Sequence, residues 1–261
     1  MSLVTITEEG AIATVTIQRP EKLNALNSAL MRELGALCQE LEARPSERRP
    51  RVVLLTGAGG RAFVAGADVA ELSTLRPAEA RRFSELGGRL GRTLEEASFP
   101  VLAVVNGFAL GGGLELALCC DLILAAESAR FGQPEVNLGL MPGFGATVRL
   151  AERVGVGWAR RMLYTGDMLS AAEAERIGLV DVVFPDGELA SSARRLAERL
   201  AAKPPLTLGA MKRSVLRTLR VGKDLGVELE TQAFAGLFAS HDAAEGMSAF
   251  LSKREPEFSG R

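Results

Sequence analysis

Three short runs of the chain are almost entirely apolar and end at residues typical of turns. They are RVVLLTG at residues 51–57, VLAVV at 101–105 and LILA at 122–125. A strand without polar alternation is buried on both faces, which is typical of parallel sheets covered by helices on each side. Between these runs, the segments beginning at Ser28 and Pro77 repeat apolar residues at helical spacing. The pattern therefore predicts an α/β fold.

The two ends of the chain have different patterns. Residues 4–8 and 11–17 alternate with period two, which predicts a β-hairpin. From Leu189 onward the pattern is helical almost to the end. We therefore expect an α/β core that carries the site over residues 1–190 and a C-terminal helical region over residues 191–261.

Composition argues against several kinds of partner and location. The net charge of −1 provides no basic field for a nucleic acid or an anionic membrane. The odd number of cysteines, Cys38, Cys119 and Cys120, fits reduced thiols rather than a disulfide framework. No run reaches the roughly 18 apolar residues of a membrane helix, and the first residues do not have the features of a signal peptide. We expect a cytoplasmic protein.

Metal, triad and dinucleotide sites are all disfavoured. His241 is the one histidine, and the cysteines are not spaced as ligand pairs, so no metal site is expected. A Ser-His-Asp triad would need that histidine, and the Gly-x-Ser-x-Gly motif is absent from the sequence. Gly57 to Gly60 follow a predicted strand, but Ala62 replaces the third glycine of a dinucleotide fingerprint.

Two carboxylates stand out because of their apolar surroundings. Glu115 is the one charged residue of an apolar segment that follows the glycine triplet Gly111–Gly113, and Glu135 follows a second apolar stretch. An ionised carboxylate is expensive to bury without a partner. Structural roles remain open, since Glu115 could pair with an arginine and Glu135 could lie in a solvated loop.

The glycine triplet also has two interpretations. It could allow close packing of a helix against a strand. Alternatively, the helix N-terminus that it begins has unpaired backbone N–H groups, which can stabilise a developing oxyanion. The small residues Ala65 to Asp68 could supply a second such amide. With one neutral acid and one charged base, this site could add water to a double bond or remove it.

Five segments, in order along the chain, resemble motifs of the enoyl-CoA hydratase/isomerase (crotonase) family. They are RPEKLNALN at 19–27, AFVAGAD at 62–68, NGFALGGG at 106–113, FGQPEVNLGLMPGFG at 131–145 and EGMSAFLSKREPEF at 245–258. The resemblance implies a core of repeated ββα units wound into a spiral. It also implies C-terminal helices that build a homotrimer, usually stacked as a dimer of trimers.

The resemblance also implies roles for individual residues. The backbone amides of Ala67 and Gly112 would hold the thioester oxygen. Glu115 would deprotonate the water that attacks C3, and Glu135 would deliver the proton to C2. The residues implied in substrate binding are Leu23, Ala25, Ala65, Ala67, Asp68, Val69, Ala70, Gly112 and Lys253. Lys253 could reach a nucleotide phosphate from a neighbouring subunit, or it could be a solvated lysine at the end of a helix.

Because both glutamates are present, the resemblance favours an enoyl-CoA hydratase of fatty acid β-oxidation. Such an enzyme adds water in the syn sense across the 2,3 double bond of a 2-enoyl-CoA, and coenzyme A is part of the substrate rather than a cofactor. A double-bond isomerase, a hydratase for a branched acyl-CoA such as methylglutaconyl-CoA, and a non-catalytic binding member are the alternatives. Leu114, Ala146 and Val148 depart from the residues common in the family, which leaves the acyl chain open.

Overall fold

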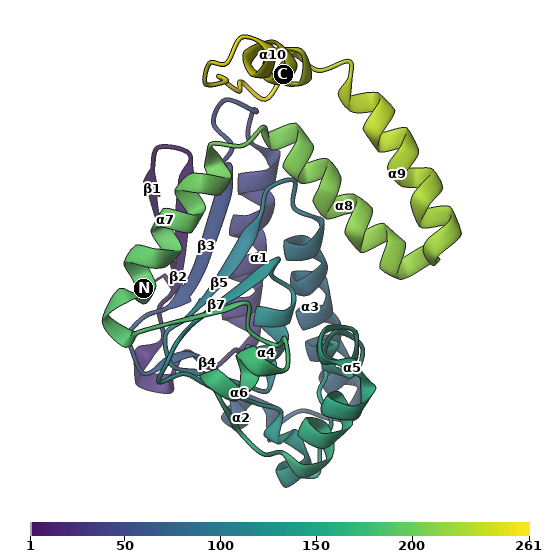
Figure 1. Ribbon diagram of the computed structural model, residues 1–261. Helices are drawn as coiled ribbons and strands as arrows, with labels where there is room; N and C mark the ends of the chain where they lie inside the picture. The colour runs from purple at the N-terminus through teal and green to yellow at the C-terminus, as the bar shows by residue number, and fades with distance from the viewer. Residues whose placement is uncertain (1) are drawn as a thin grey trace.

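The computed structural model describes residues 2–261, and its core contains two β-sheets (Figure 1). The larger sheet has the strand order β1-β2-β3-β5-β7-β10, and all of its pairs except β1–β2 are parallel. Its strands are β1 (Val4–Glu9), β2 (Ile12–Ile17), β3 (Val52–Gly57), β5 (Val101–Val105), β7 (Leu122–Ala126) and β10 (Val182–Phe184). The predicted hairpin and the three predicted buried strands are confirmed.

The larger sheet is buried on both faces, as its apolar strands predict. Alternate residues of β3 enter two separate hydrophobic clusters, with Val53 and Leu55 in one and Val52 and Leu54 in the other. The first cluster also contains residues of α1 (Ser28–Ala43) and α3 (Pro77–Glu96), and the second contains residues of α7 (Leu189–Ala201). Helices on opposite faces therefore account for the missing polar alternation.

The smaller sheet was not predicted. It has the order β4-β6-β8-β9, with β4, β6 and β8 parallel to one another. Its strands are β4 (Ala62–Ala65), β6 (Phe108–Leu110), β8 (Arg130–Gly132) and β9 (Leu169–Ser170). Ala62–Ala65, in the stretch rich in small residues after β3, form a strand because they pair with β6. Strands this short have no sequence period of their own and depend on neighbours far along the chain.

The two sheets alternate along the chain, which confirms the repeated ββα architecture. A strand of the larger sheet is followed by a strand of the smaller sheet and then by one or more helices, beginning with β3, β4, α2 (Val69–Leu72) and α3. The next repeats are β5, β6 and α4 (Gly112–Leu118), and then β7, β8 and α5 (Ala146–Thr165). A short helix, α6 (Ala171–Arg176), precedes β10.

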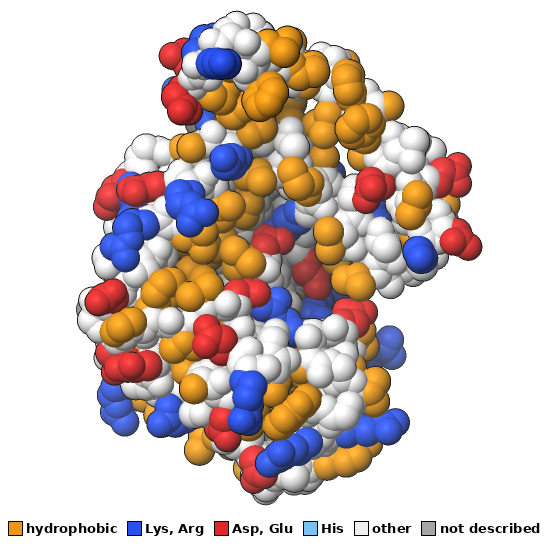
Figure 2. All heavy atoms as spheres, viewed as in Figure 1, with side chains coloured by type: hydrophobic (Ala, Val, Ile, Leu, Met, Phe, Trp, Pro, Cys, Tyr) orange, Lys and Arg blue, Asp and Glu red, His pale blue; other side chains and the backbone are white. Residues whose placement is uncertain are grey.

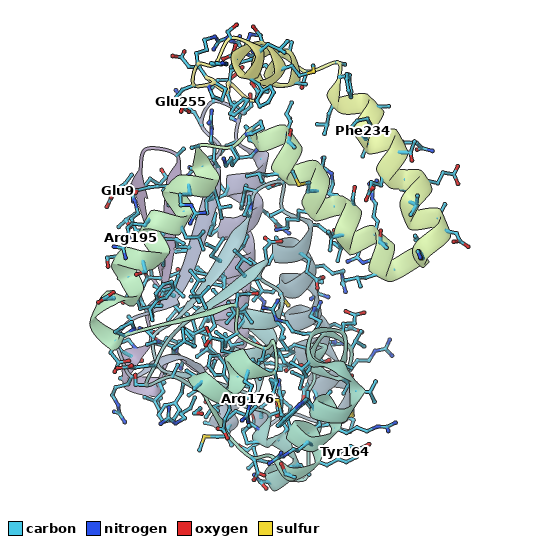
Figure 3. The ribbon with its side chains drawn as sticks, in the orientation of Figure 1. Glu9, Tyr164, Arg176, Arg195, Phe234 and Glu255 are labelled. Atoms are coloured by element: carbon cyan, nitrogen blue, oxygen red, sulfur yellow. The ribbon has the colours of Figure 1, made fainter. Side chains whose placement is uncertain are left out.

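The C-terminal helices extend away from the sheets (Figure 1). They are α8 (Pro205–Val221), α9 (Lys223–Leu237) and α10 (His241–Leu251). Figure 3 labels Arg195 on α7, which covers the larger sheet, and Phe234 on the projecting α9. The division predicted at residue 190 stays a prediction. None of the helices in residues 2–261 has both the length and the apolar character needed to cross a membrane.

Candidate active site

The smaller sheet brings together three segments that are far apart in the sequence. Ala65 of β4 pairs with Leu110 of β6, and Leu110 pairs with Gly132 of β8. Ala67 lies two residues after Ala65, and Gly112 lies two residues after Leu110. Together with Glu115 and Glu135, they line one cavity of about 290 Å³. The four predicted catalytic residues are therefore neighbours in space.

The backbone amide of Ala67 is free because its neighbours take the available bonds. Leu26 N donates to Gly66 O at 2.8 Å, and Asp68 N donates to Leu26 O at 2.7 Å. Successive N–H groups of an extended chain point to opposite edges, so the Ala67 N–H faces away from Leu26. Within residues 2–261, this N–H has no hydrogen-bond partner.

The backbone amide of Gly112 is free because Gly112 begins a helix. It is the first residue of α4, and the first N–H groups of a helix have no partner within it. In the part of the chain described by the structure, the Gly112 N–H donates to no other group either. Two unpaired donors in one cavity wall can together accept an oxyanion.

The glycine triplet serves both packing and the site. A β-carbon on Gly113 would lie 1.9 Å from the carbonyl oxygen of Val64, so Gly113 allows α4 to approach β4. A β-carbon on Gly111 would lie 2.8 Å from Glu135 Oε1, and its backbone has φ +49° and ψ −124°. Gly113 therefore fits the packing interpretation, whereas Gly112, with its unpaired N–H, fits the interpretation as an oxyanion donor.

Glu115 is buried, with 2% of its surface exposed. Its Oε1 accepts hydrogen bonds from Phe144 N at 2.7 Å and from Ala146 N at 2.9 Å. Burial raises the pKa of Glu115, and these two donors and the nearby Arg149 partly oppose that rise. The predicted alternative of a structural pair with arginine does not hold, because Arg149 pairs instead with Glu95.

Glu135 lies on a 3₁₀ helix, Pro134–Leu138, and is half-buried in the cavity wall. Loss of solvent raises the pKa of Glu135 to about 7, and the nearby charge of Glu115 adds to the rise. The alternative of a solvated loop residue is therefore wrong. Near neutral pH, one proton can be held between the two carboxyl groups.

The sequence did not predict a role for Gln133, which is buried beside Glu135. With its amide assigned so that the nitrogen faces the carboxylate, Gln133 donates to Glu135 Oε1 at 2.9 Å and to Oε2 at 3.0 Å. With the amide turned over, its oxygen can accept the proton of the neutral acid. Gln133 can therefore hold Glu135 in place in both protonation states.

The predicted substrate-binding residues fall into two groups. Leu23 lies beside β4, since Ala65 N donates to its carbonyl oxygen at 3.0 Å, and Asp68 pairs with Arg19 at 2.9 Å. Within the chain, Lys253 follows α10 at the far end from α2 and α4 (Figure 1). The residues near the site are Leu23, Ala25, Ala65, Ala67, Asp68, Val69, Ala70 and Gly112.

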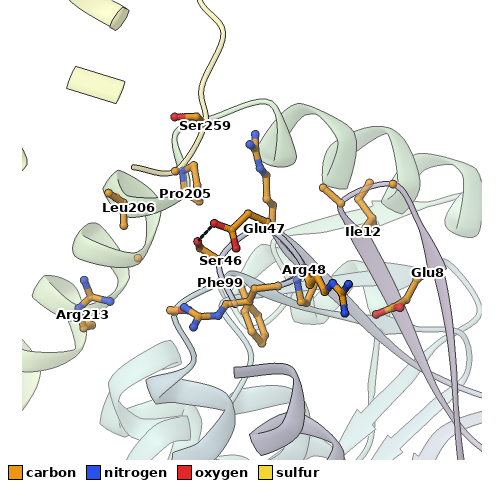
Figure 4. A pocket seen from close by; sticks show the side chains of 18 residues that line it. Glu8, Ile12, Ser46, Glu47, Arg48, Phe99, Pro205, Leu206, Arg213 and Ser259 are labelled. Carbon is orange, nitrogen blue, oxygen red and sulfur yellow. Dashed lines mark hydrogen bonds between the residues drawn. The ribbon is translucent and has the colours of Figure 1, made fainter. Parts of the chain in front are cut away.

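A second cavity, of about 390 Å³, lies between the core and the start of α8 (Figure 4). Its lining includes Arg48, Arg49 and Arg213 together with Glu8 and Glu47. None of the predicted site residues lines it. The predicted chemistry therefore belongs to the first cavity.

Comparisons with known proteins agree with this geometry. The sequence profile described as enoyl-CoA hydratase/isomerase matches residues 7–261. A short-chain-enoyl-CoA hydratase of Clostridium acetobutylicum is 42% identical over 97% of this chain and 96% of its own length. A crotonyl-CoA hydratase of Syntrophomonas wolfei is 42% identical over 98% of this chain and 97% of its own. The crystal structure of an enoyl-CoA hydratase from Bacillus anthracis superposes with a TM-score of 0.95 at 35% identity, covering 100% of both chains.

Proposed function

Because the chain belongs to the enoyl-CoA hydratase/isomerase family, we propose that its cavity performs the family's hydration reaction with Glu115, Glu135 and the two free amides. The protein is an enoyl-CoA hydratase, a lyase that reversibly adds water across the 2,3 double bond of a 2-enoyl-CoA thioester. The observation that carries the mechanism is the meeting of two carboxyl groups and two unpaired N–H groups in one cavity.

The amides act on the thioester oxygen. As water adds at C3, negative charge develops on this oxygen to form an enolate. The N–H groups of Ala67 and Gly112 are fixed before the reaction and stabilise that charge. One donor of this kind typically contributes about 2.7–4 kcal/mol.

The carboxyl groups move the protons. Ionised Glu115 takes a proton from the water whose oxygen bonds to C3, and neutral Glu135 donates its proton to C2. The raised pKa of Glu135 supports its role as the acid. After the addition, the pair still holds one proton, now on Glu115. Since the electrons and protons balance within this exchange, we propose that no cofactor or metal is required.

The test is direct. Purified protein should hydrate crotonyl-CoA to 3-hydroxybutyryl-CoA, and loss of the conjugated thioester absorbance measures the rate. The product is identified by mass, since hydration adds one water whereas isomerisation adds none. Conversion without a change in mass would favour the isomerase, and binding of the thioester without conversion would favour the non-catalytic alternative.

The shared proton predicts a specific pH dependence. We expect kcat/KM to fall as the pH rises through about 7, because Glu135 is then ionised along with Glu115. At low pH, kcat/KM should fall again, because both Glu115 and Glu135 are then protonated. Hydration and dehydration should follow the same profile, since each starts from a pair that holds one proton. Rates for both directions between pH 5 and 9 test this, and a rate that rises through pH 7 in either direction would contradict it.

We also propose that the chain forms a homotrimer or a dimer of trimers through its C-terminal helices, in the cytoplasm. The helices expose many large apolar side chains, and hydrophobic side chains are visible over them in Figure 2. Among these side chains, Phe250 is 83% and Leu251 is 81% exposed. Others on the same helices are Met211, Val215, Leu219, Val227, Phe234 and Phe238. Contiguous exposure of this kind is typical of a protein–protein interface. Three free buried cysteines support a reducing compartment.

This assembly predicts a mass in solution. Light scattering should give three or six times the 27.7 kDa of one chain. Replacing Phe234 and Phe238 together by Ser should reduce that mass, because their packed rings are 63% and 60% exposed on α9. A wild-type mass of a single chain would contradict the proposal.

A further inference from the structure

Apart from the catalytic groups, the cavity is lined mostly by apolar side chains. They include Leu72, Ala80, Phe83, Leu140, Met141 and Phe144. An acyl chain extending from C3 of the substrate would contact these side chains. Whatever closes this part of the cavity sets the length of chain that fits.

The ring of Phe144 lines this cavity and is held on several sides. Its centroid lies 5.5 Å from that of Phe83. A β-carbon on Gly87 of α3 would lie 2.2 Å from Phe144 Cδ1, and one on Gly112 would lie 3.0 Å from Phe144 Cε2. The ring therefore fills the space left by two glycines and has 8% of its surface exposed.

The backbone of Phe144 is held as firmly as its ring. Phe144 N donates to Glu115 Oε1 at 2.7 Å, and Arg149 Nη1 donates to Phe144 O at 2.6 Å. Arg149 is itself paired with Glu95. The backbone of Phe144 is therefore fixed on both sides, and the ring itself is confined by its contacts with Phe83, Gly87 and Gly112.

A separate, very small cavity of about 10 Å³ is also lined by Phe144. Its lining includes Gly87, Leu90, Gly91, Leu116 and Cys119, and both Phe144 and Glu115 line the two cavities. Phe144 and Glu115 together therefore separate the catalytic cavity from a small, mostly apolar space beside α3.

We propose that Phe144 is a specificity-determining residue that ends the acyl cavity and restricts the enzyme to short acyl chains. This inference rests on the proposed function, because it identifies the cavity beyond Glu115 as the acyl site. Removing the ring joins the two cavities and lengthens the acyl site. A chain that is one methylene too long for a rigid apolar pocket loses about 10-fold or more in kcat/KM.

The test compares chain lengths within each variant. We measure kcat/KM of the wild type, Phe144→Leu and Phe144→Ala for four-carbon crotonyl-CoA and eight-carbon 2-octenoyl-CoA. The octenoyl-to-crotonyl ratio should rise about 10-fold or more in Phe144→Ala, and by less in Phe144→Leu. Because the ratio is taken within one protein, a general loss of rate from a shifted Glu115 cancels. The control is Phe184→Leu. Phe184 is a partly buried residue of β10 that packs against the hydrophobic cluster containing α7 residues, so its replacement should leave the ratio unchanged.

A binding measurement separates this inference from the proposed function. Calorimetry with saturated butyryl-CoA and octanoyl-CoA requires no turnover, and Phe144→Ala should shift the preference toward octanoyl-CoA about 10-fold. If the wild type hydrates neither enoyl-CoA, the proposed function fails while this shift still tests Phe144. The inference is overturned if both Phe144 variants keep the wild-type ratios, or if the wild type already prefers eight carbons to four.

Discussion

Replacing Glu135 by Gln is expected to lower kcat for crotonyl-CoA hydration by about 10²–10⁴-fold and to leave KM nearly unchanged. The amide keeps the shape of the side chain but cannot deliver a proton to C2. The proton is needed only as the transition state forms, so substrate binding should be retained. Steady-state rates over a range of crotonyl-CoA concentrations measure both constants.

Glu115→Gln should lower kcat to a similar extent for a different reason, since it removes the base that activates water. Its Oε1 can still accept from Phe144 N and Ala146 N, so the loop that follows Met141 should remain in place. The double variant should be little slower than the slower single variant, because the two groups act as one unit.

Folding and chemistry can be separated in these variants. The thermal midpoint of Glu115→Gln should not fall, because the substitution removes a buried ionisable group whose desolvation is unfavourable. Glu127→Gln, which changes an exposed glutamate after β7, should retain full activity. Wild-type kcat in both site variants would show that the carboxyl groups do not carry the reaction.

Gly113→Ala is expected to damage both stability and activity. Its β-carbon would lie 1.9 Å from Val64 O, 2.7 Å from Val64 C and 2.8 Å from Val64 Cβ. A backbone carbonyl cannot turn aside as a flexible side chain can, so α4 must move away from β4. Overpacking usually costs about 1–3 kcal/mol, and we expect the upper end or more. The movement would also carry the Gly112 N–H away from Ala67, which should lower kcat.

Urea unfolding and crotonyl-CoA kinetics measure the two effects of Gly113→Ala. Gly35→Ala is the matched control, because a β-carbon there would have Leu90 Cδ1 as its nearest atom at 3.9 Å. In the interior of α1, alanine should stabilise the helix by about 1 kcal/mol relative to glycine. The two substitutions should therefore change the free energy of unfolding in opposite directions. Equal stability of Gly113→Ala and the wild type would mean that α4 and β4 are not packed this closely.

Much of the fold was predictable because its main elements carry strong local patterns. The apolar runs of β3, β5 and β7 predicted strands buried on both faces, and Asn27 caps α1 where the pattern predicted a helix start. The four strands of the smaller sheet were missed. Their two to four residues have no distinctive period, and their pairing joins residues that are far apart in the chain.

The residues of the candidate site were likewise predictable only in part. Glu115 and Glu135 were found because ionisable groups are rare in apolar segments, and the family resemblance added Ala67 and Gly112. Gln133, Phe144 and Arg149 were not found, because a glutamine, phenylalanine or arginine in these segments has no local signal that distinguishes it from a structural residue.

Residue type and local spacing were enough to predict the α/β class, the candidate carboxyl groups and the chemistry open to them. The sharing of one cavity by the four predicted groups could be seen only in the folded chain. The pairing of β4 with β6 and of β6 with β8 brings them together, and this pairing depends on contacts across the whole core. The same packing removes solvent from Glu135 and raises its pKa to about 7, so that burial gives it the properties of an acid.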